Sequence, residues 1–264
     1  MKILSLWLEA CDTKHTCLPE SPPEFLPTRL IDVSPDSTTH TVRLLYTTSS
    51  LPISTRYLAL SHRWGPPRPA TPSTFGTAPS SDHPPLTRKT VRTTQLEDTT
   101  SPSGTPLSHR EIPLASLPAT FHDAILVTRG LGVRYLWIDS LCIIQNSPED
   151  WTRQSALMES VFSGAYCTIA AASASGTDDG FLRARPERAR DVVVMRGGGD
   201  MPEFYVCEMV DDFEEDVGQN ELQRRGWVLQ ERALSRRTIH FAARQTYWEC
   251  GGGVRCETLT RMNK

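Results

Sequence analysis

The stretch from 134 to 173, "RYLWIDSLCIIQNSPEDWTRQSALMESVFSGAYCTIAAAS", places an amphipathic segment between two short apolar runs. The run at 134–139 is almost continuously apolar and ends in an acid, which is typical of a central parallel strand covered on both faces. A Ser-Pro pair then begins a segment with an apolar stripe, which predicts a helix over 147–165. The run at 166–173 predicts another strand. The stretch is therefore a strand–helix–strand unit of an α/β fold.

The same alternation extends toward the amino terminus. "YLALS" at 57–61 predicts a strand, and apolar residues at helical spacing, followed by glycines, predict a helix over 116–132. The resulting order favours an α/β fold, a parallel sheet with flanking helices and right-handed crossovers. Ten of the chain's 20 prolines lie in 66–113, so we expect a flexible proline-rich insertion after the first strand.

The second half is expected to extend this sheet with an added β segment. The runs at 191–195 and 203–210 can form a hairpin around "RGGGD", and 238–241 and 246–250 predict two more strands. At the other end of the chain, one helical stripe consists of Ile3, Leu4, Trp7, Leu8 and Cys11. It predicts a short amphipathic helix that docks on the body.

Composition and charge narrow the function classes. The chain has 264 residues, of which 38% are hydrophobic and 22% are charged. This composition is typical of a soluble globular protein. The formal net charge of -3 disfavours general nucleic-acid binding. We expect no membrane span, because no run of about 18 apolar residues occurs. Seven cysteines without a convincing secretion signal predict free thiols in a reducing compartment, the cytoplasm.

Polar side chains follow the predicted parallel strands, at the ends where such sheets bind ligands. Ser61, His62, Arg63 and Trp64 end the first strand, and Asp139 ends the second. These five residues are candidates for substrate binding. In the alternative interpretation, His62 and Arg63 only satisfy loop carbonyls and Asp139 only caps a turn.

The stretch "RRGWVLQERALSRR" at 224–237 offers a candidate catalytic acid. Trp227 and Glu231 are four residues apart and share one helical face. Glu231 is either an exposed acid paired with a neighbouring arginine such as Arg232, which stabilises little, or an acid held beside an aromatic ring for chemistry. The spacing alone leaves both interpretations open.

A cysteine-histidine pattern near the amino terminus raises the question of a metal. Cys11, His15 and Cys17 form C-x3-H-x-C, and zinc would need a fourth ligand. Three distant cysteines could supply it through folding: Cys142, Cys250 and Cys256. Because this spacing is not that of a standard zinc finger, we expect no metal. We expect instead a buried cysteine pair that anchors the first helix.

Several long strings of this chain resemble one known family. "YLALSHRWG", "LPATFHDAI", "GVRYLWIDSLCIIQNSPEDW", "ALMESVFSGAYCTIAAASA", "RGWVLQERALSRRTIHF" and "YWEC" occur in this order. Together they resemble the fungal heterokaryon-incompatibility (HET) domain over 55–257. The segment 1–54 resembles the lead-in of such domains, and 258–264 forms a tail. The resemblance implies an effector or signalling role in the cell death that follows fusion of unlike fungal cells. Its partner would be a second copy or another incompatibility protein.

HET domains have a proposed kinship with Toll/interleukin-1 receptor (TIR) domains, so the resemblance implies a TIR-like, flavodoxin-like parallel sheet. TIR domains that cleave NAD carry a Trp-x-x-x-Glu pattern, which Trp227 and Glu231 match, although Val228 replaces a common cysteine. The resemblance therefore implies that Glu231 is catalytic, that NAD is the substrate, and that no cofactor is needed. The implied substrate-binding residues are Ser61, His62, Arg63, Trp64, Asp139, Trp227 and Arg232. Alternatives are a non-enzymatic self-associating scaffold and an inactive truncated copy.

Overall fold

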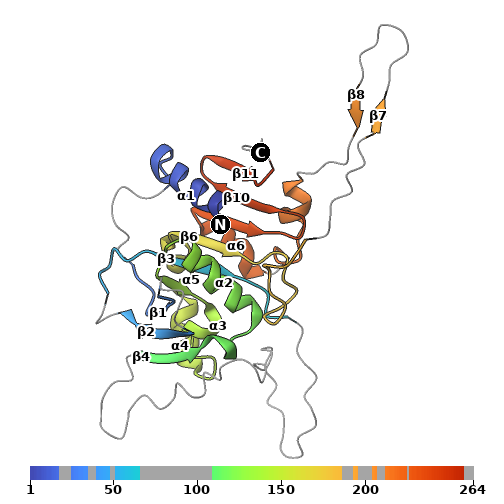
Figure 1. Cartoon of the computed structure of the whole chain (residues 1–264). Helices are drawn as coiled ribbons and strands as arrows, with labels where there is room; N and C mark the ends of the chain where they lie inside the picture. Colours follow the sequence, from blue (N-terminus) through green and yellow to red (C-terminus); the bar gives the residue numbers. More distant parts are fainter. Residues whose placement is uncertain are drawn as a thin grey trace, which may run out of the picture.

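The apolar runs that predicted strands lie side by side at the centre of the computed structural model (Figure 1). β3 (Tyr57–Ser61) lies between β5 (Tyr135–Trp137) and β6 (Cys167–Ala170) and is parallel to both, and β9 (Arg237–Phe241) is parallel to β6. Every residue of these four strands is buried, as expected for a sheet covered on both faces. The structure describes residues 1–17, 25–34, 40–47, 51–65, 109–185, 193–195, 204–206, 212–224 and 226–258.

The four parallel strands are added on both sides of the first one. Their order in the sheet is β5-β3-β6-β9. Along the chain β3 comes first, β5 is then placed on one side of it, and β6 and β9 are placed on the other side. The winding direction therefore reverses between β3 and β6. Open α/β sheets bind ligands at such a reversal, outside the carboxyl ends of the strands. The polar residues after β3 thus lie where a ligand site is expected, and those after β5 end the adjacent parallel strand.

The sheet as a whole is mixed and mostly antiparallel, which corrects our prediction of a parallel sheet. Its nine strands have the order β11-β10-β9-β6-β3-β5-β1-β2-β4, and five of the eight pairings are antiparallel. β1 (Arg29–Asp32) lies beside β5 and is followed by β2 (Thr41–Tyr46), and β10 (Thr246–Cys250) lies beside β9 and is followed by β11 (Gly253–Cys256). Short turns can join only antiparallel neighbours, and such turns connect β9, β10 and β11.

Two segments outside the predicted domain core contribute strands to this sheet. β1 and β2 come from the lead-in 1–54, and β1 pairs with β5, so the sheet is continuous across the predicted domain boundary. β4 (His109–Pro113) ends the predicted insertion 66–113 and pairs with β2, so this part is a strand rather than a loop. A single 3-10 turn, η3 (Leu114–Ser116), follows it. Residues 66–108 lie outside the described residues.

The first helix docks as its stripe predicted. α1 (Lys2–Lys14) buries Leu4, Trp7, Leu8 and Cys11 and contacts β10 (Figure 1). α2 (Ala119–Gly130) confirms the helix expected after the insertion, and α3 (Asp139–Cys142) is a single turn directly after β5.

The helix predicted over 147–165 is two helices, α4 (Pro148–Ser155) and α5 (Met158–Gly164). The predicted start is confirmed, because the Ser147 side chain accepts the backbone N–H of Asp150 at 3.2 Å and caps α4. The residues that α4 buries are polar, whereas α5 buries apolar ones. The two halves therefore pack against chemically different surroundings.

The second half forms a helix over the sheet and a separate hairpin. A one-turn π-helix, η4 (Glu214–Gly218), precedes α6 (Gly226–Leu234), which connects toward β9 and packs against α5. β7 (Val193–Met195) and β8 (Phe204–Val206) form the predicted hairpin. Contrary to our expectation, this hairpin is a sheet of its own and does not extend the large one.

One main core covers most of the sheet. It joins apolar residues of α1, of the helices α2 to α5 and of the strands β1 to β6, β9 and β10, and a smaller cluster lies between η4, α6, β10 and β11. Among the described residues, no helix combines the length and apolar character needed to cross a membrane.

Candidate functional site

Asp139 brings the strand-end side chains into one corner. Trp64 donates its indole N–H to Asp139 Oδ2 at 2.9 Å. Asp139 Oδ1 accepts the backbone N–H of Ser140 at 2.6 Å and lies 3.8 Å from His62 Nδ1. Three predicted site residues, His62, Trp64 and Asp139, therefore meet at the carboxyl ends of β3 and β5.

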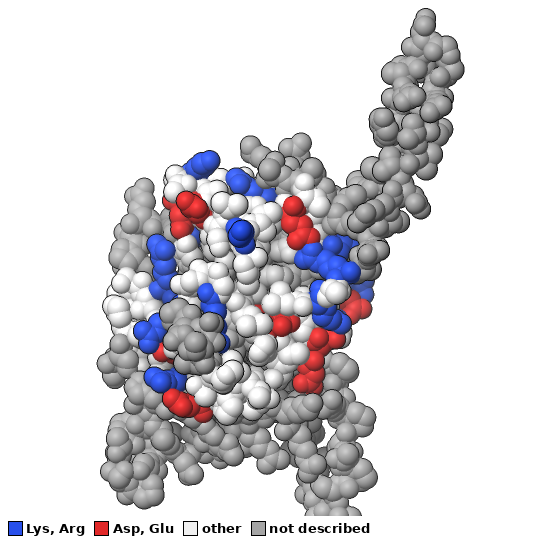
Figure 2. Space-filling model, in the orientation of Figure 1, with Lys and Arg blue, Asp and Glu red and all other residues white. Residues whose placement is uncertain are grey.

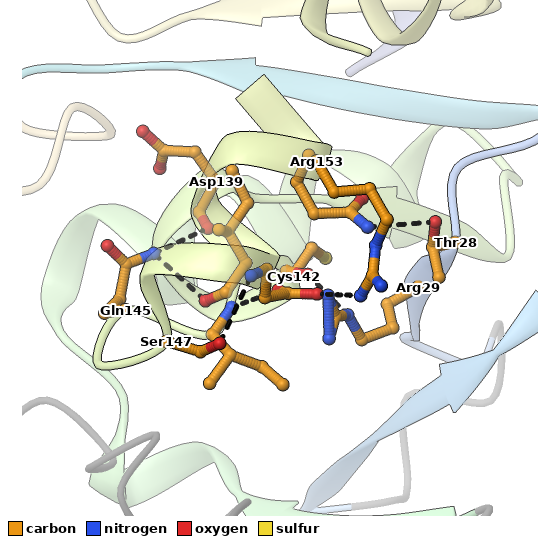
Figure 3. A network of polar contacts seen from close by, with 11 residues as sticks. Thr28, Arg29, Asp139, Cys142, Gln145, Ser147 and Arg153 are labelled. Carbon is orange, nitrogen blue, oxygen red and sulfur yellow. Dashed lines mark hydrogen bonds and ion pairs between the residues drawn. The ribbon is translucent and has the colours of Figure 1, made fainter. Parts of the chain in front are cut away.

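The segment that follows Asp139 is fixed by a network of polar contacts (Figure 3). Arg29 of β1 donates through Nε to the carbonyl oxygen of Cys142 at 2.7 Å, and its Nη2 pairs with Asp150. The side-chain amide of Gln145 donates to the backbone carbonyl of Asp139 at 3.1 Å. These contacts hold the turn that carries the Asp139 carboxylate.

Two loops cross closely beside this corner. Gly65 has a φ of +87°, which favours glycine, and a Cβ built at Gly176 would lie 3.0 Å from the Gly65 Cα. Thr177 Oγ1 donates to the Trp64 carbonyl at 3.1 Å, and Thr120 Oγ1 of α2 donates to the Gly176 carbonyl at 2.9 Å. The loops after β3 and β6 are thereby tied to each other and to the start of α2.

The interior of the corner is buried and polar. His62 is 3% exposed, and its ring lies at 85° to the Phe121 ring with a centroid distance of 5.2 Å. The hydroxyls of Ser61 and Ser140 are also buried, and neither has a hydrogen-bond partner among the described residues. An unsatisfied buried hydroxyl costs roughly 1–3 kcal/mol. A ligand that bonds to these hydroxyls would recover that free energy.

Arg63 connects the corner with the segment that leads into α6. Its Nη1 lies 2.6 Å from Glu221 Oε2, and the Arg63 side chain is partly exposed. An anionic ligand at the corner would compete with Glu221 for this guanidinium.

Glu231 faces the interior of the protein. It is 9% exposed, and its backbone carbonyl accepts the Ser235 hydroxyl at 2.6 Å. The Ser235 hydroxyl in turn lies 2.7 Å from Thr168 Oγ1 on β6, so this end of α6 lies over β6. The interpretation of Glu231 as an exposed acid paired with a neighbouring arginine therefore does not hold. The side chain of Trp227 lies outside the described residues.

Arg232, an expected substrate-binding residue, is engaged with another carboxylate. It donates to Glu249 through Nε at 2.8 Å and through Nη2 at 3.1 Å, and it lies over the Phe213 ring. Glu249 Oε2 is also 3.1 Å from His240 Nε2. Burial raises the pKa of Glu249, but the hydrogen bonds with His240 and Arg232 outweigh it and lower the pKa to about 2. Burial lowers the pKa of His240.

Glu249 and His240 were not among the residues predicted from the sequence. They lie diagonally across the β9–β10 ladder, in which His240 pairs with Tyr247 and Glu249 with Thr238. A histidine and an acid on inward positions of adjacent predicted strands would have been the signal.

The cysteine-histidine pattern gains a fourth member through folding. Cys11, His15, Cys17 and Cys250 place one donor atom each within 4.8 Å of the others. Of the three cysteines that the spacing left open, Cys250 is the one that joins the group among the described residues. Four such donors can hold a metal ion.

Charges of both signs are interspersed on the surface shown in Figure 2. That face carries acidic and basic side chains near one another rather than a field of one sign. Together with the net charge of -3, this distribution gives no support for a nucleic-acid surface there.

The comparisons with known proteins identify a family. A family model described as "Heterokaryon incompatibility protein (HET)" matches residues 57–231, more than half of the chain. No curated protein and no solved structure matches. The matched segment starts at the first residue of β3 and includes the strand-end corner and α6 up to Glu231. This chain belongs to the heterokaryon incompatibility (HET) family.

Proposed function

We propose that this chain is an effector or signalling module of heterokaryon incompatibility that promotes cell death by cleaving NAD in the cytoplasm. The observation that carries the proposal is the burial of Glu231, which is 9% exposed on α6. A carboxylate removed from water is costly, and proteins retain such groups where they are paired or reactive. The segment before α6 also meets the strand-end corner, through Arg63 and Glu221.

The proposed reaction needs one carboxylate. The bond between the ribose anomeric carbon and the nicotinamide nitrogen breaks, and its electron pair leaves with neutral nicotinamide. A general acid is therefore unnecessary, unlike in ordinary glycoside hydrolysis. Water forms the new bond to the anomeric carbon and loses one proton, which gives ADP-ribose. Glu231 would stabilise the positive charge that develops on the ribose ring.

The corner supplies groups for binding. The Ser61 and Ser140 hydroxyls would bond to ribose or phosphate oxygens, and Arg63 would leave Glu221 to bind the pyrophosphate. His62 and Asp139 would shape the polar wall, with Trp227 as the proposed stacking partner of nicotinamide. We now assign Arg232 to holding Glu249 rather than to the substrate.

Nicotinamide release tests this function. Purified chain at high concentration is incubated with NAD, and nicotinamide is measured by chromatography. We expect release from the wild type and from Glu149→Gln, an exposed control on α4, and none from Glu231→Gln. Equal release from Glu231→Gln, or none from the wild type, contradicts NAD cleavage at Glu231.

An exposed leucine favours a second candidate, a non-enzymatic self-associating module. Leu229 of α6 is 65% exposed, two residues before the buried Glu231. In this case toxicity in a fungal host survives Glu231→Gln and is lost in Leu229→Lys. Leu6→Lys, at a leucine 61% exposed on α1, is the matched control. Loss of toxicity in Glu231→Gln alone rejects this candidate.

A further inference from the structure

Four soft donors from the two ends of the chain meet beside the sheet. Cys11 comes from the last turn of α1, His15 and Cys17 follow it, and Cys250 ends β10. Their donor atoms lie within 4.8 Å of one another, and Cys250 Sγ is 3.4 Å from His15 Nδ1. The strand-end corner and Glu231 do not use these residues, so the group requires its own explanation.

Local structure aims the first three donors at one point. Cys11 and His15 are four residues apart, and the His15 N–H still bonds to the Cys11 carbonyl at 3.2 Å. His15 has extended dihedrals, φ -122° and ψ 152°, so the chain leaves the helix there. Residues two apart in extended chain point to the same side, which brings Cys17 beside His15.

Separate contacts hold this end of α1 against the sheet. Asp12 lies 2.6 Å from Arg237 Nη1, and the Tyr166 hydroxyl donates to Asp12 Oδ2 at 2.6 Å. The Arg237 side chain is fully buried. The approach of α1 to β10 therefore does not depend on the cysteine-histidine group alone.

Two glycines make room for the donors. A Cβ at Gly252 would lie 2.3 Å from His15 Cε1, and a Cβ at Gly251 would lie 3.3 Å from Cys17 Sγ. Neither glycine has a positive φ, whereas Gly253 does, with +113°. The absence of a side chain at 252 is thus required by the close approach of His15 and not by the turn.

The donor set selects the kind of ion. Three thiolates and one imidazole complete a tetrahedral structural zinc site, and no oxygen donor is present in the group for calcium or magnesium. Zn–S bonds of about 2.3 Å put tetrahedral sulfurs roughly 3.8 Å apart, so a small contraction of the side chains closes the shell. The Gly252 N–H also donates to Cys250 Sγ at 3.3 Å, an outer contact that orients this thiolate.

We propose that Cys11, His15, Cys17 and Cys250 bind one zinc ion that fastens α1 to the β10–β11 hairpin. With four protein ligands the ion has no open position, so its role is structural. A surface pocket of about 320 Å³, lined in part by Cys17, Cys250 and Gly251, gives the ion a path to the site. Binding would add its free energy to that of folding and join residues 235 positions apart.

Metal analysis of the full chain tests the proposal. The protein is purified without chelators, and zinc is measured by mass spectrometry. We expect one zinc per chain, and a loss of most zinc in Cys17→Ser and His15→Ala. Cys142→Ala, at a buried cysteine outside the group, should retain the ion. A wild type without zinc, or folded Cys17→Ser with a full equivalent, overturns the proposal.

Two further measurements on the wild type test the site even if the ligand variants do not fold. Cobalt substituted into the wild type should show thiolate-to-cobalt charge-transfer absorption and the visible bands of a tetrahedral ion, and their absence overturns the site. Peptide mapping without reductant should find Cys11, Cys17 and Cys250 free of disulfides, and a disulfide among them also overturns it. Gly252→Ala should lower the zinc affinity at least tenfold, because its Cβ displaces His15.

Discussion

Arg29 and Asp150 form an ion pair in the interior although 121 residues separate them along the chain. Their side chains are 1% and 3% exposed. Arg29 lies on β1, before the segment that the HET family model matches, and Asp150 lies on α4 within it. The lead-in is thus part of the structure that positions Asp139.

Removal of Arg29 should destabilise the protein strongly. Arg29→Met leaves the buried Asp150 charge with the Ile144 backbone N–H and, as its charged partner, Arg153, which lies 2.5 Å from it and is 66% exposed. We expect a loss of roughly 3 kcal/mol in the free energy of unfolding, measured by urea denaturation. Arg153→Met, the control, should lose less than about 1 kcal/mol. Equal losses of unfolding free energy in the two variants would show that the buried ion pair does not stabilise the protein more than the exposed one.

Asp139→Asn should weaken the strand-end corner. The carboxylate oxygens accept hydrogen bonds from the Trp64 indole and from the Ser140 backbone. In asparagine one oxygen is replaced by an NH2 group, which is a donor and cannot accept either of these hydrogen bonds. We expect a loss of about 1–3 kcal/mol in unfolding free energy and reduced nicotinamide release. Glu159→Gln, at an exposed position of α5, should change neither quantity. Normal nicotinamide release from a stably folded Asp139→Asn would show that the strand-end corner does not take part in the reaction.

Two glycine substitutions should separate backbone strain from crowding. Gly65→Ala forces alanine into a φ of +87° and places its Cβ 3.3 Å from the Gly176 Cα. Gly132→Ala has a similar φ of +70° but meets no atom within 4 Å. Each should lose about 1–2 kcal/mol through the left-handed backbone, and Gly65→Ala should lose more. Equal melting temperatures would show that the two loops can separate without cost.

Glu249 should contribute to the loss of folding stability at low pH. Its pKa in the folded chain is about 2, against an ordinary value of 4.5. Because the folded value is the lower one, the contribution is complete above pH 4.5 and is lost as the pH falls toward 2. Urea unfolding at a series of pH values should therefore show a smaller decline in Glu249→Gln than in the wild type across this window. Parallel curves for the two proteins would contradict the lowered pKa.

Several features of the fold could be predicted because their signals are local. The buried runs at 57–61 and 134–139 identified β3 and β5, the Ser147 start identified α4, and the apolar stripe at the amino terminus identified α1. Each depends on the 3.6-residue or two-residue period of side chains in one element. The family was also recognised from strings within these elements.

The candidate site could be predicted only in part. The rule that ligands bind at strand ends brought His62, Trp64 and Asp139 together, and the structure has them in contact. The partner of Arg232 could not be predicted, because Glu249 is on another strand and several acids were available. A pairing between distant residues depends on how the elements close onto each other, which no local period encodes.

The sequence by itself determined the family, the four central strands and the first helix, since burial periodicity and long shared strings are properties of neighbouring residues. Only the tertiary structure decided that the sheet is mostly antiparallel, that Glu231 faces the interior, and that Cys250 completes the group of Cys11, His15 and Cys17. These features join residues far apart in the chain. Their geometry is set when the hydrophobic core closes and the loops between the elements are fixed.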